Sequence, residues 1–310
     1  FPTTANAYQN SYQDFNAFKN QLMDFAQTYY PNTFNTKANY FKSNAQNIEI
    51  LFLGSSHTQN SVNPKYIDIS SVNLAYGSQD YELDAAIYFK YIDRLNKVNK
   101  VVIEIDYHSL EKKNKDDFYR LLWYYKYYNI NLNNFKSYNK LSLFASNPVF
   151  FKNYLKNKLN PFNKKAIINE FGFIENDSDI FEKFNFDKKT IIETSLTRLK
   201  NRHNIESIAN FEFNKEILKS LIDNCIKKNI QVIILKNPQY LTYVNNYNKE
   251  KIKRRNIFLD SLSSIEKIKI LDFETDTRFN VNDFKNDNHL NSNGAEKLSK
   301  LINEEINTWK

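Results

Sequence analysis

Five short runs of apolar residues, separated by longer segments with helical periodicity, limit the folds that this chain can adopt. The runs are rich in Ile and Val and cover residues 48–53, 72–75, 101–105, 232–235 and 268–273. Most of them are apolar at nearly every position, which is typical of strands that are covered on both faces. Such strands belong to a parallel sheet between two layers of helices. We therefore expect an α/β sandwich with a mainly parallel five-stranded sheet.

The segments between and after these runs have apolar residues at every third or fourth position, as amphipathic helices do. This periodicity predicts helices over residues 81–95, 214–228, 249–263 and 294–309. Strands and helices thus alternate as in a doubly wound fold. Residues 46–110 and 211–310 are expected to form one domain, and residues 1–45 are interpreted as an amphipathic leader that packs on it.

Residues 111–210 interrupt the alternation, because they contain no comparable apolar run. Aromatic side chains are concentrated within this segment, at residues 118–128 and 144–154. We interpret it as a large helical insertion over the carboxyl edge of the sheet. Two roles remain open: a lid or cap that binds an acceptor through aromatic faces, or an insertion whose aromatic residues only pack its own core.

Composition restricts the kind of partner. The 310 residues include 43 Lys and Arg and 35 Asp and Glu, for a net charge of +8. Positive charge favours anionic partners in general, but the lysines are spread among acidic residues, and no zinc-finger or RNA-recognition motif is present. We therefore expect no nucleic-acid partner, and we interpret the positive charge as solvated helix faces.

The sequence also predicts neither a metal site nor a cofactor. Its single cysteine, Cys225, excludes an intrachain disulfide and a multi-cysteine metal site. His, Asp and Glu residues do not occur at metal-binding spacings. With only 4 glycines, the chain has no glycine-rich nucleotide loop either.

The first apolar run ends abruptly in Gly54-Ser55-Ser56-His57-Thr58. In open α/β sheets, ligands bind at the carboxyl ends of the strands. A serine at the start of a helix there can present its hydroxyl group outward and its backbone N–H toward a developing oxyanion. Ser56 is therefore a candidate nucleophile, and the alternative is a simple helix N-cap.

A polar segment before the last predicted helix places a histidine beside a carboxylate. His289 lies in the sequence Asn-Asp-Asn-His-Leu of residues 286–290. A histidine base needs an acceptor on its far ring nitrogen, which selects the tautomer and stabilises the imidazolium. His289 is therefore a candidate base for Ser56, and the alternative is a surface histidine without a role.

Together, these motifs resemble the SGNH hydrolase and acyltransferase superfamily, especially its extracytoplasmic polysaccharide O-acetyltransferases and lipoteichoic acid D-alanylation proteins. Residues 51–58 look like the nucleophile block, residues 73–79 like the block whose glycine helps to form the oxyanion hole, and residues 287–291 like the block that supplies acid and base. The resemblance covers roughly residues 45–110 and 215–308. It implies a three-layer, flavodoxin-like SGNH sandwich that carries the large helical insertion.

The resemblance also implies roles for single residues. Ser56 would be the nucleophile and His289 its base, and the amides of Ser56 and Gly77, helped by Gln79, would hold the oxyanion. The superfamily normally adds an oxyanion asparagine after the third strand, but residues 106–109 of this chain include none.

The acid of the triad departs from the pattern of the superfamily. The usual aspartate lies three residues before the histidine, where this chain has Asn286. We expect Asp287 to be the acid, with Asn286 as a weaker orienting residue or Asp283 as a further candidate.

The resemblance implies a serine-dependent acyltransferase that O-acetylates, or otherwise acylates, a cell-surface polysaccharide through an acyl-Ser56 intermediate. The expected partners are an acyl donor, a glycan acceptor and a membrane-bound acyltransferase that delivers the acetyl group. The alternatives are a carbohydrate esterase with the same residues and a non-catalytic glycan-binding protein. Because the chain starts at Phe1 rather than Met, we expect an extracytoplasmic protein, membrane-tethered through a removed N-terminal segment.

Overall fold

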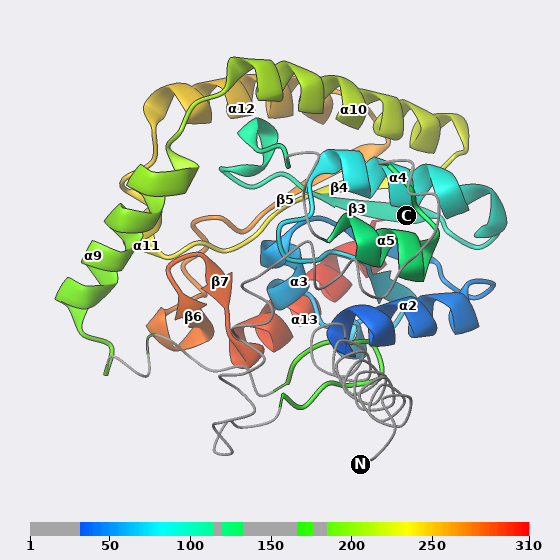
Figure 1. Cartoon of the computed structure of the whole chain (residues 1–310), viewed down its shortest axis with the longest axis horizontal. Helices are drawn as coiled ribbons and strands as arrows, with labels where there is room; N and C mark the ends of the chain where they lie inside the picture. The colour runs from blue at the N-terminus through cyan, green and yellow to red at the C-terminus, as the bar shows by residue number, and fades with distance from the viewer. Residues whose placement is uncertain (1–31, 115–119, 133–165, 176–180, 182–184, 310) are drawn as a thin grey trace, which may run out of the picture. The chain divides into compact units, whose positions relative to one another are not determined.

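The computed structural model describes residues 32–114, 120–132, 166–175, 181 and 185–309. The chain divides into two compact units, one of residues 1–36 and 116–165 and the other of residues 37–115 and 166–310. The larger unit contains the sheet and the C-terminal helix (Figure 1). Residues 166–210, which the sequence analysis placed in the insertion, are thus grouped with the sheet.

The larger unit is built on a five-stranded sheet in the order β2-β1-β3-β4-β5. The strands are β1 (Ile50–Leu53), β2 (Ser71–Asn73), β3 (Lys100–Glu104), β4 (Gln231–Lys236) and β5 (Ile268–Asp272). Each neighbouring pair is parallel. This is the strand order of the flavodoxin-like doubly wound fold, so the predicted fold class is confirmed. Each of the five predicted strands is present within two residues of its expected bounds.

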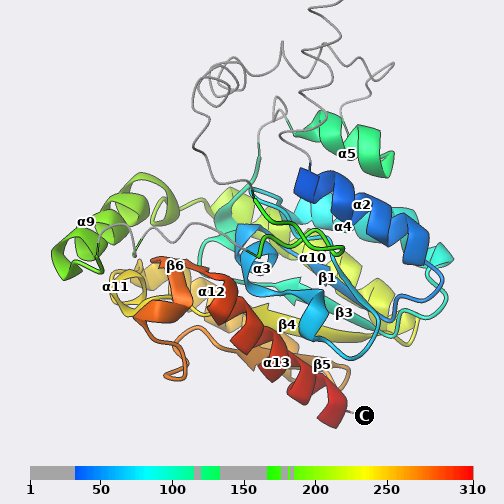
Figure 2. The same ribbon diagram turned by 90° about the horizontal axis from the view of Figure 1, so that it is seen from below.

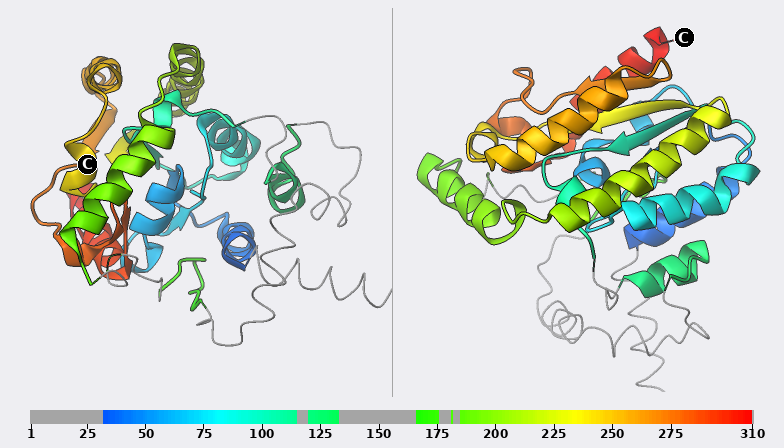
Figure 3. Two further views of the ribbon diagram at one scale, coloured as in Figure 1. Left: turned by 60° about the vertical axis from the view of Figure 1, so that its left-hand side comes forward. Right: turned by 90° about the horizontal axis from the view of Figure 1, so that it is seen from above.

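Helices cover both faces of this sheet (Figures 2 and 3). One face carries α4 (Tyr81–Tyr91), α10 (Ile208–Lys227) and α12 (Lys249–Ser263), and the other carries α3 (Ser56–Ser61) and α13 (Ser292–Thr308). The four predicted helices are confirmed. The start of α10, however, lies at Ile208 rather than at residue 214. Ser207 caps this end, since its Oγ accepts from the N–H of Asn210 at 3.3 Å.

Further elements complete the described part of the chain. The helices are α2 (Asn32–Asn44), α5 (Leu121–Tyr128), α9 (Lys188–Arg198) and α11 (Leu241–Val244), with a π-helical turn at Leu199–His203. Single 3₁₀ turns lie at Pro64–Tyr66, Ile92–Arg94, Ser109–Glu111 and Val281–Asp283. The strands β6 (Phe284–Asn286) and β7 (His289–Leu290) form an antiparallel hairpin just before α13.

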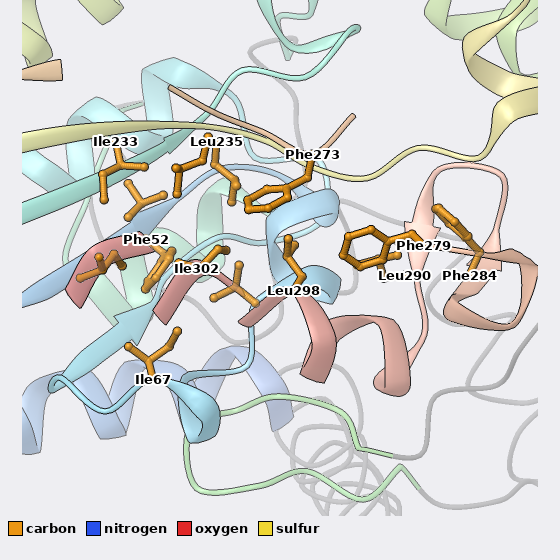
Figure 4. Packing of buried hydrophobic residues seen from close by; sticks show 14 of the residues in the cluster. Phe52, Ile67, Ile233, Leu235, Phe273, Phe279, Phe284, Leu290, Leu298 and Ile302 are labelled. Atoms are coloured by element: carbon orange, nitrogen blue, oxygen red, sulfur yellow. The ribbon is translucent and has the colours of Figure 1, made fainter. Parts of the chain in front are cut away.

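Apolar side chains from the sheet, α13 and the hairpin form one buried cluster (Figure 4). Phe52 comes from β1, and Leu298 and Ile302 lie one turn apart on α13. Leu290 of β7 belongs to the same cluster and is 1% exposed. Full burial of a side chain of this size contributes about 1.5–3 kcal/mol. The core thus anchors the hairpin that carries His289.

In the smaller unit, aromatic side chains pack against one another. Phe34 contacts four rings of α5 at centroid distances of 5.0–5.9 Å: Trp123, Tyr124, Tyr127 and Tyr128. In this part of the insertion the aromatic residues therefore pack a local core. The aromatic cluster at residues 144–154 lies outside the described residues, and its role as a lid stays a prediction. None of the helices in the described ranges is long and apolar enough to cross a membrane.

Candidate active site

Ser56 is the first residue of α3 and comes three residues after the end of β1. The turn between them needs Gly54, whose φ is +147° and whose Cβ, if present, would lie 2.6 Å from Glu104 Cβ. Ser55 caps the helix by accepting from the N–H of His57. The backbone N–H of Ser56 has no hydrogen-bond acceptor among the described residues. It is therefore available to an oxyanion.

A buried carboxylate holds this turn rigidly. Glu104, at the end of β3, accepts from the backbone N–H groups of Ser55 at 2.9 Å and Thr58 at 3.0 Å through Oε2. Its Oε1 accepts from Ser55 Oγ at 2.6 Å. These bonds compensate for the burial of the carboxylate, which is 1% exposed. The position of Ser56 is thus set by the contact between the ends of two neighbouring strands.

Ser56 and His289 form a hydrogen-bonded pair. The distance from Ser56 Oγ to His289 Nε2 is 2.9 Å, which is in the range of a nucleophile bound to its base. On the far side of the ring, His289 Nδ1 lies 3.0 Å from Asn286 Oδ1. Because the Asn286 oxygen can only accept, Nδ1 carries the hydrogen and the lone pair of Nε2 faces the serine. The imidazole is in the tautomer that can take the serine proton.

The hairpin explains why Asn286, and not Asp287, meets His289. Asn286 and His289 are register partners across β6 and β7, and paired residues project to the same face of a ladder. Asp287 lies in the turn, where its carboxylate accepts from Arg198 Nε at 2.9 and 3.2 Å. The structure therefore corrects the expectation that Asp287 orients His289.

Asp283, the further candidate for the acid, is also engaged elsewhere. Its carboxylate accepts from the N–H of Asn280 at 2.9 Å, closing a capping box, and from Lys297 Nζ at 2.6 Å. Asp283 therefore stabilises the turn before the hairpin and is not a partner of the His289 ring.

The base is electrically neutral at physiological pH. Burial lowers the pKa of His289 well below its ordinary value, and a proton on His57 or the charge of Arg198 lowers it further. A neutral imidazole is ready to accept a proton. The imidazolium, however, gains less from the neutral amide of Asn286 than it would from a carboxylate.

The two other expected oxyanion residues are both engaged within the protein. The N–H of Gly77 donates to Gln59 Oε1 at 2.7 Å. Gln79 is 2% exposed, and its Nε2 donates to Asp84 Oδ1 at 2.5 Å. The Gln79 amide is therefore not directed toward Ser56. The Gly77 amide is bound by Gln59, which lies one helical turn after Ser56.

A second imidazole–carboxylate pair, which the sequence analysis missed, lies beside the nucleophile. His57 Nδ1 is 2.6 Å from Asp106 Oδ2, and the two side chains are 2% and 0% exposed. Asn237, at the end of β4, donates its backbone N–H to Asp106 Oδ1 at 2.7 Å and its Nδ2 to Oδ2 at 3.1 Å. Burial, and then the charge of Glu104, raise the pKa of Asp106 to about 6.

His57 also contacts the loop that carries the base. Its Nε2 lies 2.9 Å from Asn288 Nδ2, and its ring centroid is 4.9 Å from that of His289 at an interplanar angle of 81°. His108 follows at 4.5 Å from His57, and His203 stacks on His108 at 4.5 Å. The 4 histidines of the chain therefore form one continuous series of rings that starts at the base.

One signal in the sequence points to these missed residues. His57 and Asp106 each follow a predicted strand, at the edge of the sheet where ligands bind. Asp106 lies in the segment where the superfamily pattern has an asparagine and this chain has none.

A metal ion does not fit the donors at this edge. Within the described residues, one group of side chains has ligand atoms close enough together to hold an ion: His57, Glu104 and Asp106. Both oxygens of each carboxylate already accept hydrogen bonds from the protein. The 2.6 Å between His57 Nδ1 and Asp106 Oδ2 is a direct hydrogen bond, and ligands that share an ion at about 2.0–2.2 Å each lie farther apart.

An open groove of about 450 Å³ runs along α9 and the following π-helical turn. It is lined by hydroxyl, amide and charged side chains: Thr190, Glu193, Thr194, Thr197, Arg198, Asn201 and Arg202. Arg198 connects the groove to the hairpin, because the same guanidinium binds Asp287. This groove thus lies beside the loop that carries His289.

Comparisons with known proteins give one matching family model and several matching solved structures. The family model matches residues 183–309, which is less than half of the 310 residues. No curated protein matches the chain.

Solved structures from three bacteria match this chain at low similarity. A candidate acylhydrolase from Bacteroides fragilis is 13% identical, with a TM-score of 0.41 over 87% of this chain and 96% of that one. A lipase/acylhydrolase from Enterococcus faecalis is 12% identical, with a TM-score of 0.39 over 84% and 95%. A GDSL-like lipase from Bacteroides thetaiotaomicron is 10% identical, with a TM-score of 0.40 over 87% and 98%. At such low similarity, function has to be inferred from the site itself.

Proposed function

We propose that this chain is a serine-dependent acyl-transfer enzyme of the SGNH type, with Ser56 as nucleophile and His289 as base. The observation that supports this most is the hydrogen bond of 2.9 Å between Ser56 Oγ and His289 Nε2. Asn286 holds the opposite ring nitrogen at 3.0 Å and so selects the productive tautomer. A chance contact between two polar side chains would not need this third group.

In the first step, Ser56 Oγ attacks the carbonyl carbon of the acyl donor while His289 Nε2 takes its proton. The N–H of Ser56 stabilises the charge that develops on the carbonyl oxygen. When the tetrahedral intermediate collapses, the leaving group takes the proton from His289, and the acyl group stays on Ser56. In the second step, His289 removes the proton of an acceptor hydroxyl, that oxygen attacks the acyl group, and Ser56 leaves with the proton.

The acceptor in this proposal is a hydroxyl group of a cell-surface polysaccharide, and the acyl group is acetyl. The groove along α9 supports a hydroxyl-rich acceptor, because its threonine, asparagine and arginine side chains can hydrogen-bond to sugar hydroxyls. Delivery of the acetyl group by a membrane-bound acyltransferase, and an extracytoplasmic, membrane-tethered location, belong to the same proposal and follow from the resemblance of the sequence motifs.

Two other functions use the same residues differently. A carbohydrate esterase would pass through the same acyl-Ser56 and transfer the acyl group to water. A non-catalytic glycan-binding protein would keep the fold but not the chemistry, and the amide of Asn286 in place of a carboxylate favours that alternative. The fate of an acyl group placed on Ser56 distinguishes the three.

The test is mass spectrometry after incubation with p-nitrophenyl acetate, with and without an oligosaccharide acceptor. We expect an acetyl adduct on Ser56 that moves to the oligosaccharide, and no adduct in Ser56→Ala. An adduct that is lost to water at the same rate with and without the acceptor would assign the esterase. An unmodified wild-type protein that still binds the oligosaccharide would assign the binding protein.

A further inference from the structure

The catalytic pair lacks a carboxylate on its base but has one on the neighbouring imidazole. Asn286, which accepts from His289, carries no charge. His57, the residue after the nucleophile, packs its ring edge-to-face with that of His289 at 4.9 Å. Asp106 lies on the other side of His57, at 2.6 Å from Nδ1. A buried carboxylate is thus separated from the base by a single imidazole ring.

The hydrogen bonds around His57 define where its proton lies. Asp106 Oδ2 lies 2.6 Å from His57 Nδ1, closer than the amide nitrogen of Gln239, which is 3.2 Å from the same atom. An ionised carboxylate can only accept, so in a neutral His57 the hydrogen lies on Nδ1 and is donated to Asp106. Nε2 then keeps its lone pair, 2.9 Å from Asn288 Nδ2. A neutral His57 bound to an ionised Asp106 leaves one net negative charge in this buried pair.

This negative charge is held in place by the protein. Asn237 donates two hydrogen bonds to the carboxylate of Asp106, from its backbone N–H and from Nδ2. Thr58 Oγ1 in turn accepts from the same Nδ2 at 3.1 Å. The pair is buried, so water screens the charge little, and a charge across one imidazole ring changes a protonation equilibrium by roughly ten- to a hundredfold at an effective dielectric constant of about 20.

We propose that Asp106, acting through His57, is the positioning residue that supplies negative charge to His289 when it takes the serine proton. Asn286 then performs only the orienting part of the role of a triad acid, and the electrostatic part is moved to Asp106. This inference rests on the proposed function of Ser56 and His289.

The same pair positions the hairpin. Asn288, which contacts His57, directly precedes His289 in the chain. Its backbone N–H donates to Asn286 Oδ1 at 3.1 Å. His57 therefore contacts both the ring of the base and the turn that presents it. A change at Asp106 is thus expected to affect His289 rather than the whole fold.

The test measures the rate constant for labelling of Ser56 by a fluorophosphonate, in which the O–P bond forms, fluoride leaves and His289 takes the proton. Four proteins are compared: wild type, Asp106→Asn, Asn286→Asp and the double variant. We expect Asp106→Asn to slow labelling by about ten- to a hundredfold. Asn286→Asp returns a carboxylate directly to His289, so the double variant should label within about threefold of Asn286→Asp alone.

Wild-type labelling that Asp106→Asn leaves unchanged would overturn the inference, and so would a double variant that is no faster than Asp106→Asn. Loss of a purely structural residue would not be rescued by a carboxylate at position 286. Asp84→Asn is the matched control, because it makes the same chemical change in another buried carboxyl group of this edge, and Asn286→Asp should not rescue any loss that it causes. Absence of labelling in wild type would instead refute the proposed function.

A measurement on the wild-type protein keeps the test independent of how Asp106→Asn folds. Nitrogen-15 NMR of the His57 ring at pH 7.5 distinguishes its two neutral tautomers and its cation. We expect the neutral form with hydrogen on Nδ1. A neutral ring with hydrogen on Nε2 would contradict the inference, because His57 could not then donate to an ionised Asp106. A cationic ring would contradict it too, because its charge would cancel that of Asp106.

Discussion

Asn286 Oδ1 accepts a hydrogen bond from His289 Nδ1 at 3.0 Å, across the register pair that closes the β6–β7 hairpin. An amide thus occupies the position from which a carboxylate would both orient the base and stabilise its charged form. The Asn286 amide performs the orienting part of this role through its position alone. Negative charge that stabilises the charged form of His289 has to come from another residue.

Substitution of Asn286 tests both parts of that role. Asn286→Ala removes the acceptor and should lower kcat/KM for p-nitrophenyl acetate by about ten- to a hundredfold, because the ring loses its tautomer selection. Asn286→Asp keeps the acceptor and adds charge, which raises the pKa of His289. Since the base works in its neutral form, the acid limb of the pH–rate profile should move to higher pH.

The exposed Asn282, in the preceding 3₁₀ turn, gives a charge-matched control as Asn282→Asp. Its profile should coincide with that of wild type. An equal shift in both variants would mean that general surface charge, and not the contact with His289, moves the acid limb of the pH–rate profile.

Asp287→Asn distinguishes a structural aspartate from a triad acid. The carboxylate is 0% exposed and pairs with Arg198. Its loss should reduce the free energy of unfolding by about 1–3 kcal/mol. This value lies toward the lower end for buried pairs, because Arg198 is partly exposed. Urea denaturation measures this change. In conditions where the variant is folded, kcat/KM should fall by less than about tenfold, and a loss near 10⁴ would restore Asp287 as the acid.

Gln59 controls access to the Gly77 amide. Because Gly77 N–H donates to Gln59 Oε1 at 2.7 Å, Gly77 can bind an oxyanion only if Gln59 moves aside. Gln59→Ala should leave kcat within about threefold of wild type, whereas Gln59→Glu places a negative charge next to the oxyanion and should reduce kcat by about a hundredfold. A hundredfold loss in Gln59→Ala as well would show that Gln59 is itself an oxyanion donor.

Asp84 should make the fold less stable as pH rises. Burial raises its pKa to about 8 from an ordinary value of 3.8. Between these two values the native state keeps a proton that the unfolded chain has lost, so the free energy of unfolding falls with rising pH. Urea titrations at pH 5 and pH 8 should show a smaller decrease for Asp84→Asn than for wild type. Equal decreases would mean that Asp84 is ionised in the native state.

The sheet could be predicted from the sequence because its strands are buried on both faces. Runs such as residues 48–53 are apolar almost throughout, and this pattern depends on local burial alone. The position of Ser56 follows from the same signal, since it lies just beyond the first run. The contact of Ser56 with His289 joins residues 233 positions apart, and only the resemblance of the motifs pointed to it.

The partner of His289 could not be predicted, because it depends on a hairpin too short to leave a periodic pattern. β6 has three residues and β7 has two. In such a ladder, a shift of one residue turns a side chain to the other face, and that shift decides between Asn286 and Asp287. The His57–Asp106 pair was missed for a related reason, since it forms only when the ends of β1 and β3 lie side by side.

The proposed enzyme is tested most directly by mapping the site of fluorophosphonate labelling by peptide mass spectrometry. Wild type should carry one adduct, on Ser56, and Ser61→Ala, a change in the same helix, should carry it too. Ser56→Ala should carry none. A wild-type protein that stays unlabelled, or a Ser56→Ala variant that labels as fast as wild type, would show that Ser56 is not an activated nucleophile.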